Sequence, residues 1–111
     1  MLRPLRGRIV LEAPAHTASV SYAPGPGIGA VSESLGELVD RLPRGVRVHL
    51  VGHSMGGIIA RWYVDMMGGD ERVVQTISLA SPFRGTHRAR LMPSQAGRDM
   101  LPDSQVLVRL R

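Results

Sequence analysis

Hydrophobic and polar positions along this chain repeat with two different periods, which predict strands and helices in turn. Four short apolar runs rich in β-branched residues are typical of strands, and they occupy residues 7–13, 17–23, 46–51 and 73–80. Apolar residues spaced three and four apart predict two helices, over residues 28–42 and 55–67. Pro43 ends the first helix, and Gly68 with Gly69 ends the second. Strands therefore alternate with helices, which favours the α/β class.

The same pattern sets the expected size of the sheet. Each of the first two apolar runs ends at a proline, and we expect one or both to form strands. The sequence thus predicts three to four mainly parallel strands with flanking helices. After Pro82, loop signals in the form of proline, serine and glycine continue through Gly97. One more short helix is expected over residues 104–110.

Length and composition narrow the class of protein. A chain of 111 residues is one domain, large enough to bury a core and short for many enzyme folds. Its hydrophobic content of 43% and charged content of 21% argue against disordered and membrane-embedded classes. The chain lacks both an apolar run of the roughly 18 residues that span a bilayer and a signal-peptide core, so we expect a cytoplasmic protein without a stable membrane span. The absence of cysteine excludes disulfides, thiolate metal sites and thiol catalysis.

Arginine alone carries the positive charge, which amounts to a net +5. Proteins that bind nucleic acids usually combine basic stripes with aromatic residues for stacking, and the few aromatic residues here lie outside any basic stripe. We therefore expect no nucleic-acid partner. Residues 83–90, FRGTHRAR, are the best candidate for a basic patch, and we interpret them as a solvated loop.

Residues 52–56 are the most suggestive of chemistry, because the order Gly-His-Ser-Met-Gly falls between a predicted strand and a predicted helix. So sharp a turn strains the serine backbone and brings the residues two before and two after it together, which requires small residues at Gly52 and Gly56. Gly57 adds room for the helix to lie close to the sheet. A plain glycine-serine turn does not explain this placement. We therefore interpret the motif as a nucleophile elbow.

Ser54 is the candidate nucleophile of this elbow. Its hydroxyl is expected to stand exposed above the edge of the sheet. The N terminus of the following helix directs free backbone N–H groups and the positive end of its dipole at the serine, which favours an anionic intermediate. The backbone N–H of Met55 is the expected oxyanion donor.

The elbow and the segment after it carry a family resemblance. The chain reads VHLVGHSMGG and then TISLASPFRGT, and residues 46–90 resemble the α/β-hydrolase superfamily, in particular its bacterial lipase and esterase branch. In that branch a GHSxGG elbow precedes a strand ending in a T/S-P-H-x-G-T loop, where Phe83 stands in place of the usual histidine. Residues 100–110 more faintly resemble the helix that follows. The resemblance implies a single partial α/β-hydrolase domain over residues 1–111, with its elbow core at about 46–90.

The resemblance also implies a mechanism on carboxylic esters, lipid esters included, without a metal or an organic cofactor. Ser54 would attack the acyl carbon, a histidine would take its proton, and an acid would orient that histidine. His53 is, by resemblance, a structural residue of the elbow. In the family the acid and the histidine follow further strands, and here no histidine follows His87. The upstream strand with the second oxyanion donor is also missing, so we expect this chain alone to hydrolyse activated esters slowly or not at all.

His87 is the candidate base among the histidines. The loop after a neighbouring parallel strand opens at the same edge of the sheet as the elbow, although a loop role is the simpler interpretation. The acids of residues 65–71 belong to the opposite edge, because the helix runs away from the elbow. Asp99 and Asp103 are expected to be loop or helix-cap residues.

Two other classes of function stay open. Residues 25–30, GPGIGA, match a dinucleotide-binding fingerprint, although residues 51–53 lack the acid that it needs about 20 positions later. The other alternative is a non-catalytic α/β-hydrolase remnant, or a fragment that needs a partner chain. A short parallel sheet with an apolar edge also suggests self-association.

Overall fold

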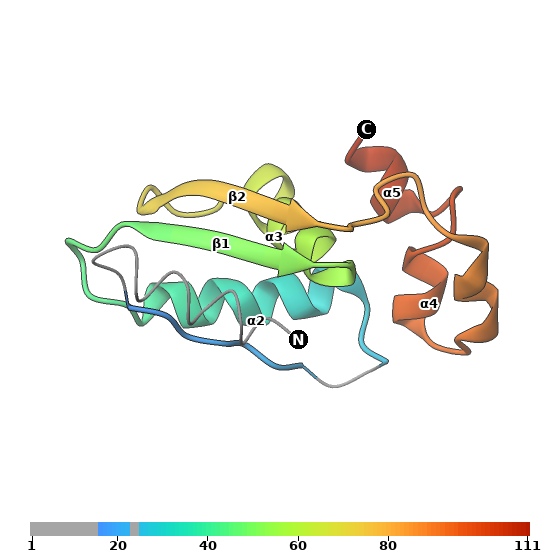
Figure 1. Cartoon of the computed structure of the whole chain (residues 1–111), viewed down its shortest axis with the longest axis horizontal. Coiled ribbons are helices and arrows are strands. Elements are labelled where there is room, and N and C mark those ends of the chain that lie inside the picture. The colour runs from blue at the N-terminus through green and yellow to red at the C-terminus, as the bar shows by residue number, and fades with distance from the viewer. Residues whose placement is uncertain (1–15, 23–24) are drawn as a thin grey trace.

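The computed structural model describes residues 16–22 and 25–111 (Figure 1). Its elements follow in the order α2, β1, α3, β2, η1, α4 and α5, where η1 is a 3₁₀ helix. They span, in that order, Ile28–Asp40, Val48–His53, Met55–Met66, Val73–Leu79, His87–Leu91, Gln95–Asp99 and Gln105–Arg109. The alternation of helix and strand confirms the α/β class predicted from the periodicity.

β1 and β2 form a parallel sheet whose two strands are joined through α3. In its register Gly52 lies opposite Ser78, and His53 lies opposite Leu79. Because parallel strands point the same way, both carboxyl ends lie at one edge of the sheet. The turn after β1 and the loop after β2 are therefore neighbours.

The periodicity predicts three to four strands, whereas the described part of the chain forms two. The run at 7–13 lies outside the described residues. Residues 17–22, the described part of the second run, contain no strand. Two of their largest side chains stay open to solvent, because Val20 is 50% and Tyr22 is 40% exposed. An alternating pattern forms a stable strand only when one face is buried against neighbours, and this segment lacks such burial.

The core lies between α2, α3 and the C-terminal segment. Each helix turns one apolar face inward, as its spacing of three and four predicts. Inside this interface the Ser32 hydroxyl donates to the Ile59 carbonyl oxygen at 2.9 Å. The buried cluster combines both helices with the C-terminal segment, and its members are Ile28, Val31, Ile58, Ile59, Ala89, Met100, Leu107 and Leu110.

The C-terminal segment is more regular than the loop signals indicate. Residues 104–110 contain α5, as predicted, while η1 and α4 occupy part of the stretch predicted as loop. Hydroxyl side chains begin all three short helices: Thr86 accepts from Arg88 N, Ser94 from Gly97 N, and Ser104 from Leu107 N. These residues favour turns and helix N-caps for the same reason, which is that their oxygens bond nearby backbone N–H groups.

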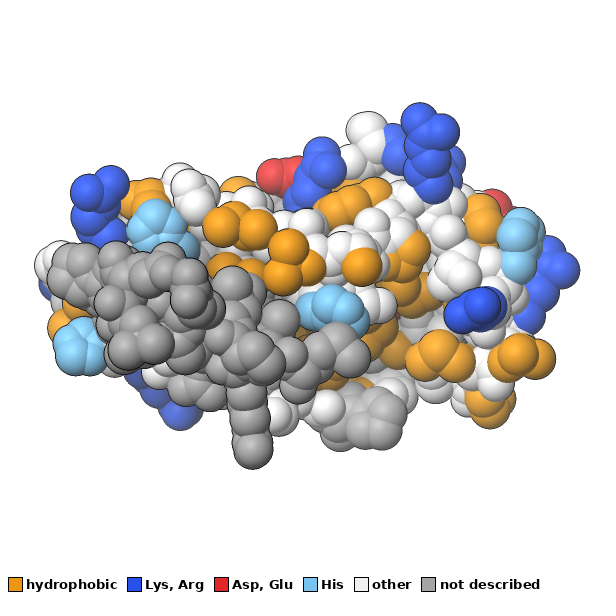
Figure 2. Space-filling model, in the orientation of Figure 1, with side chains coloured by type: hydrophobic (Ala, Val, Ile, Leu, Met, Phe, Trp, Pro, Cys, Tyr) orange, Lys and Arg blue, Asp and Glu red, His pale blue; other side chains and the backbone are white. Residues whose placement is uncertain are grey.

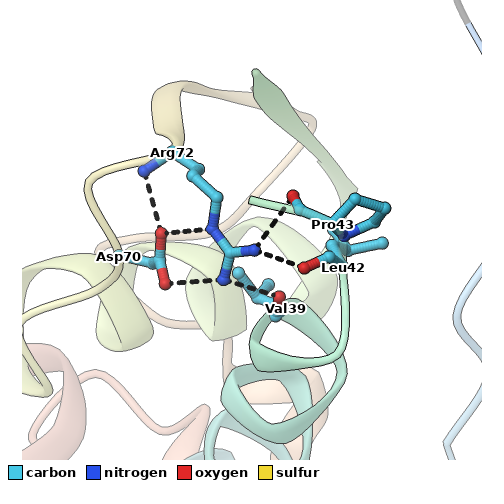
Figure 3. Close-up of polar contacts among 5 residues, drawn as sticks. All are labelled: Val39, Leu42, Pro43, Asp70 and Arg72. Atoms are coloured by element: carbon cyan, nitrogen blue, oxygen red, sulfur yellow. Dashed lines mark hydrogen bonds and ion pairs between the residues drawn. The ribbon is translucent and has the colours of Figure 1, made fainter. Parts of the chain in front are cut away.

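Arg72 fixes the opposite end of the sheet, where β2 begins (Figure 3). Its guanidinium forms a two-pronged pair with Asp70, with N–O distances of 2.9 Å. The same group donates to the carbonyl oxygens of Val39, Leu42 and Pro43 at the end of α2. One side chain therefore supplies further donors to carbonyl oxygens at and just beyond the C-terminus of a helix.

The face of the sheet turned away from α3 carries apolar side chains. Ser78 faces α3, so alternation along β2 places Ile77 on the other face, beside Val51 of β1. Ile77 is 40% exposed, and Figure 2 shows hydrophobic side chains among polar ones on the molecular face that includes the strands. Among the helices of the described residues, none is long and apolar enough to cross a bilayer.

Candidate active site

Ser54 is the single residue between the end of β1 and the start of α3. Its backbone has φ 54° and ψ −121°, a region that residues other than glycine rarely occupy. Such a conformation costs on the order of 1–3 kcal/mol and persists only where the surroundings impose it. Here two hydrogen bonds impose it: Ser54 N–H donates to Leu79 O at 2.8 Å, and Gly57 N–H donates to Ser54 O at 3.2 Å.

Two of the three glycines around this turn are required by close approach. A methyl group on Gly52 would collide with the backbone of Gly56 and Gly57. One on Gly57 would collide with the Ser81 hydroxyl and would lie 2.8–2.9 Å from the Ser78 side chain. The expected steric demand at Gly56 is not seen, because a methyl group there would meet only the Tyr22 hydroxyl, at 3.9 Å. The close contact runs through the backbone of Gly56, and its Cβ position points into open space.

The strand, turn and helix thus take the arrangement expected of a nucleophile elbow. Ser54 is partly exposed, and its side chain does not cap α3. Met55 is the first residue of α3, so its backbone N–H has no carbonyl four positions earlier inside the helix. A partly exposed hydroxyl beside free N–H groups suits attack on an acyl carbon and stabilisation of the resulting oxyanion.

The described residues do not bring a base to this hydroxyl. Among the described residues, no histidine or carboxylate forms a hydrogen bond with Ser54. His87 begins η1 with an exposed side chain, and His53 is half-buried at the end of β1. Neither histidine therefore acts as a proton acceptor for Ser54 in the part of the chain that the structure describes.

The carboxylates are engaged elsewhere in the molecule. Asp99 is buried, with Oδ2 accepting from Ile28 N–H and Oδ1 accepting from the Gln95 amide, both at 2.8 Å. It is thus a helix cap, as expected, although the helix that it caps lies 71 residues earlier. Asp70 pairs with Arg72, and hydrogen bonds from that guanidinium lower the pKa of the carboxyl group to about 2. Asp65 pairs with Arg61 along the exposed side of α3.

Asp99 also decides how the GPGIGA stretch is used. Gly27 is the N-cap of α2, and a methyl group on it would lie 2.8 Å from the Asp99 carboxylate. Hence the N terminus of this helix, where a dinucleotide fingerprint would hold a pyrophosphate, already holds a carboxylate of the same chain. Gly25 has φ 121°, a conformation that favours glycine, and its carbonyl accepts from Ala96 N–H at 3.2 Å. The glycines therefore serve contact between α2 and the C-terminal segment.

Three residues near the elbow were not singled out by sequence reasoning for the parts that they play. Tyr22 places its hydroxyl beside the start of α3, and burial raises the pKa of that hydroxyl. Ser81 follows β2 and has a buried hydroxyl without a partner among the described residues. Phe83 packs against the core with the Arg61 guanidinium 5.2 Å from its ring centre, which gives this departure from the lipase pattern a structural use. The first two lack a sequence signal, because only the fold places them beside Gly56 and Gly57 at the start of α3.

A depression of about 340 Å³ lies apart from these residues. It is lined by residues of α2, three of them acidic, and by the C-terminal end of α3 with the turn after it, namely Glu33, Gly36, Glu37, Asp40, Tyr63, Met67 and Gly69. Burial, followed by the negative charges of Asp70 and Asp40, raises the pKa of Tyr63. Within the described ranges there is no group of three or more His, Cys, Asp or Glu placed to hold a metal ion.

Comparison with known proteins gives one match. A family model for palmitoyl protein thioesterase matches residues 25–108, a span that runs from the loop before α2 into α5 and includes the elbow. No curated protein and no solved structure matches the chain.

Proposed function

This chain belongs to the palmitoyl protein thioesterase family, and from that membership we propose that it cleaves long-chain acyl thioesters with Ser54 as the nucleophile. The match establishes a hydrolase of the thioester or ester type, related to the serine hydrolases. The finer assignment departs from the lipase and esterase resemblance toward thioesters, because the family description specifies a palmitoyl thioesterase. The observation that carries the proposal is the φ 54° backbone of a serine between β1 and α3.

The proposed chemistry proceeds in two steps. Ser54 Oγ attacks the acyl carbon and loses its proton, the carbon–sulfur bond breaks, and the thiol leaves with a proton. Water then attacks the acyl-serine ester, which releases the fatty acid and restores the hydroxyl. In both steps the Met55 N–H is the proposed oxyanion donor, aided by the positive end of the α3 dipole.

The rate of this reaction depends on a base, and the described residues hold none within hydrogen-bonding reach of Ser54. His87 remains the candidate for that role and would need to approach from η1. A correctly shaped elbow without its base retains only the contribution of oxyanion stabilisation and binding. We therefore expect this polypeptide to be acylated slowly and to turn over more slowly still.

The test measures thioester cleavage and covalent labelling together. Released thiol from a palmitoyl thioester of a small thiol can be read with a disulfide dye, and the chain adds no background because it has no cysteine. A fluorophosphonate should add one adduct at Ser54, identified by peptide mass. Ser54→Ala should abolish both signals, while Ser34→Ala, at an exposed position of α2, should leave both unchanged. Labelling of a different residue, or cleavage that survives in Ser54→Ala, would refute the assignment.

A second candidate is a non-catalytic role, or a half-site that another chain must complete. The absence of a base among the described residues favours it, and the exposed Ile77 on the free face of the sheet offers a contact for a second copy. Sedimentation velocity over a range of concentrations tests whether a second copy completes the site: a mass that stays monomeric excludes this form of the second candidate.

A further inference from the structure

The exposed end of the C-terminal segment combines features that the thioesterase proposal does not use. Leu91 is 85% exposed and Met92 is 45% exposed, and the two are consecutive at the end of η1, followed by the exposed Pro93. We propose that this apolar tip, residues 91–93, together with the surrounding arginines, docks on an anionic lipid bilayer. The inference concerns binding and holds whether or not Ser54 is catalytic.

The charge around the tip matches such a surface. Arg88 and Arg90 precede the tip within η1, and Arg98 follows it in α4, all three exposed. In the part of the chain that the structure describes, none of the three pairs with a carboxylate, and Arg98 donates to the neutral Gln95 amide. Asp99, the acid nearest in sequence, is buried against the start of α2. The positive charges are therefore available to lipid phosphates and carboxylates.

The tip is held in place and does not need to order on binding. Both backbone groups of Met92 are hydrogen-bonded: its N–H donates to Ala89 O at 3.0 Å, and its carbonyl oxygen accepts from Ser94 N–H at 2.8 Å. α4 lies so close that a methyl group on Gly97 would collide with the Met92 carbonyl. Below the tip, Ala89 belongs to the buried core cluster. A preorganised apolar loop loses little conformational entropy when it enters the interface of a bilayer.

The tip lies on the side of the molecule to which the strands point. η1 and α4 follow the carboxyl end of β2, and Figure 1 shows them beyond the arrowheads of both strands. The elbow is at that same end of β1. Docking through residues 91–93 would therefore present the serine end of the sheet toward the lipid phase, where long acyl chains reside.

A lipid surface explains this composition better than a nucleic acid does. Leu91, the most exposed of the large hydrophobic residues described, supplies apolar area that phosphate contacts do not require. Single-stranded nucleic acids are bound by basic grooves with stacking aromatic side chains, whereas Phe83, the aromatic residue nearest in sequence, is packed against the core and Arg61.

Vesicle co-sedimentation tests the proposal with the whole chain. Vesicles of phosphatidylcholine with about one third phosphatidylserine should bind the protein, and pure phosphatidylcholine should bind it far less. Arg88→Gln with Arg90→Gln should weaken partitioning about fivefold per arginine, and high salt should do the same. Leu91→Ser with Met92→Ser should weaken it about tenfold through lost apolar burial.

Matched variants at the other end of the molecule serve as controls. Met66→Ser with Met67→Ser removes an equally adjacent, exposed apolar pair, and Arg44→Gln with Arg47→Gln removes the same charge from the connection before β1. Both should bind like the wild type. The proposal is overturned if the wild type does not bind anionic vesicles, or if the control variants lose as much binding as the tip variants. It is also overturned if Leu91→Ser with Met92→Ser binds vesicles like the wild type and the protein binds single-stranded RNA equally strongly. Circular dichroism of each variant establishes that the fold is retained.

Discussion

Gly56 and Gly57, which are adjacent at the elbow, differ in how much space surrounds their Cβ positions. Gly56 and Gly57 both belong to the first turn of α3, where glycine is less favourable than alanine by roughly 0.5–1 kcal/mol. The Cβ position of Gly56 is open, while that of Gly57 is filled by Ser78 and Ser81. At the scale of single residues, the local motif identifies glycines, and only the packing shows which of them is indispensable.

This difference predicts substitutions of opposite sign. Gly56→Ala should raise the free energy of unfolding by about 0.5–1 kcal/mol, because alanine favours the helix and its methyl group would meet only the Tyr22 hydroxyl, at the ordinary contact distance of 3.9 Å. Gly57→Ala should lower it by about 1–3 kcal/mol, because α3 must move away from β2 to make room. Urea denaturation followed by tryptophan fluorescence measures both. Equal effects of the two substitutions would contradict the geometry of this turn.

At the scale of elements, the end of α2 depends on a residue from the start of β2. Arg72 donates to three carbonyls at that helix end and is itself oriented by Asp70. The pair is largely shielded, with side-chain exposures of 15% for Arg72 and 18% for Asp70. The end of α2 and the start of β2 are therefore connected through Arg72, which the ionised carboxyl group of Asp70 orients.

The lowered pKa of Asp70 predicts how the stability of this contact between Asp70, Arg72 and the end of α2 depends on pH. Hydrogen bonds from Arg72 lower that pKa from 3.8 to about 2, so the ionised form is favoured in the folded state. Its stabilising effect is complete above the unfolded pKa of 3.8 and is lost as the pH falls through about 2. Asp70→Asn should therefore be less stable than the wild type at pH 5, and the gap should narrow between pH 4 and pH 2.

Thermal unfolding across that pH range provides the measurement. Asp65→Asn is the control, since its pair with Arg61 is exposed on α3 and such pairs contribute about 0–1 kcal/mol. If the difference in stability between the wild type and Asp70→Asn stays constant down to pH 2, the charge of the Asp70 carboxyl group does not stabilise the contact with Arg72.

At the scale of the whole molecule, the C-terminal segment is attached to the first helix by a buried carboxylate. Asp99 accepts the N–H of Ile28, a residue with no exposed surface at the start of α2. The two residues are 71 positions apart, so this contact closes most of the chain into one body. Leu107 and Leu110 of the same segment join the core around α3.

Removing this contact should loosen the segment and not the elbow. Asp99→Ala should cost about 1–3 kcal/mol, because the Ile28 N–H loses its acceptor in a buried place. Asp103→Ala, at an exposed position of the same segment, should change stability by less than about 0.5 kcal/mol. Hydrogen exchange should show faster opening in residues 86–110, with β1 and β2 protected as before. Unchanged exchange in that segment would mean that the core contacts alone hold it.

Local patterns determined the central part of this protein. The spacing of apolar residues was sufficient for α2 and α3, because each of these helices buries one apolar face. Short β-branched runs were sufficient for β1 and β2, which pair with each other although β2 stays largely exposed. The turn at Ser54 was also predictable from the sequence. The motif of residues 52–56 has a glycine at each end and joins a strand directly to a helix. Sequence therefore identified the α/β class and the place of the turn between β1 and α3.

Tertiary structure decided what depends on distant partners. Residues 17–22 have the alternation of a strand without its burial, and η1 and α4 are too short to form without the core on which they pack. The same serine and threonine oxygens cap helices or bend loops according to that packing. The position of the Asp99 carboxylate at the start of α2 follows from a contact between residues 71 positions apart, and local periodicity carries no information about such contacts.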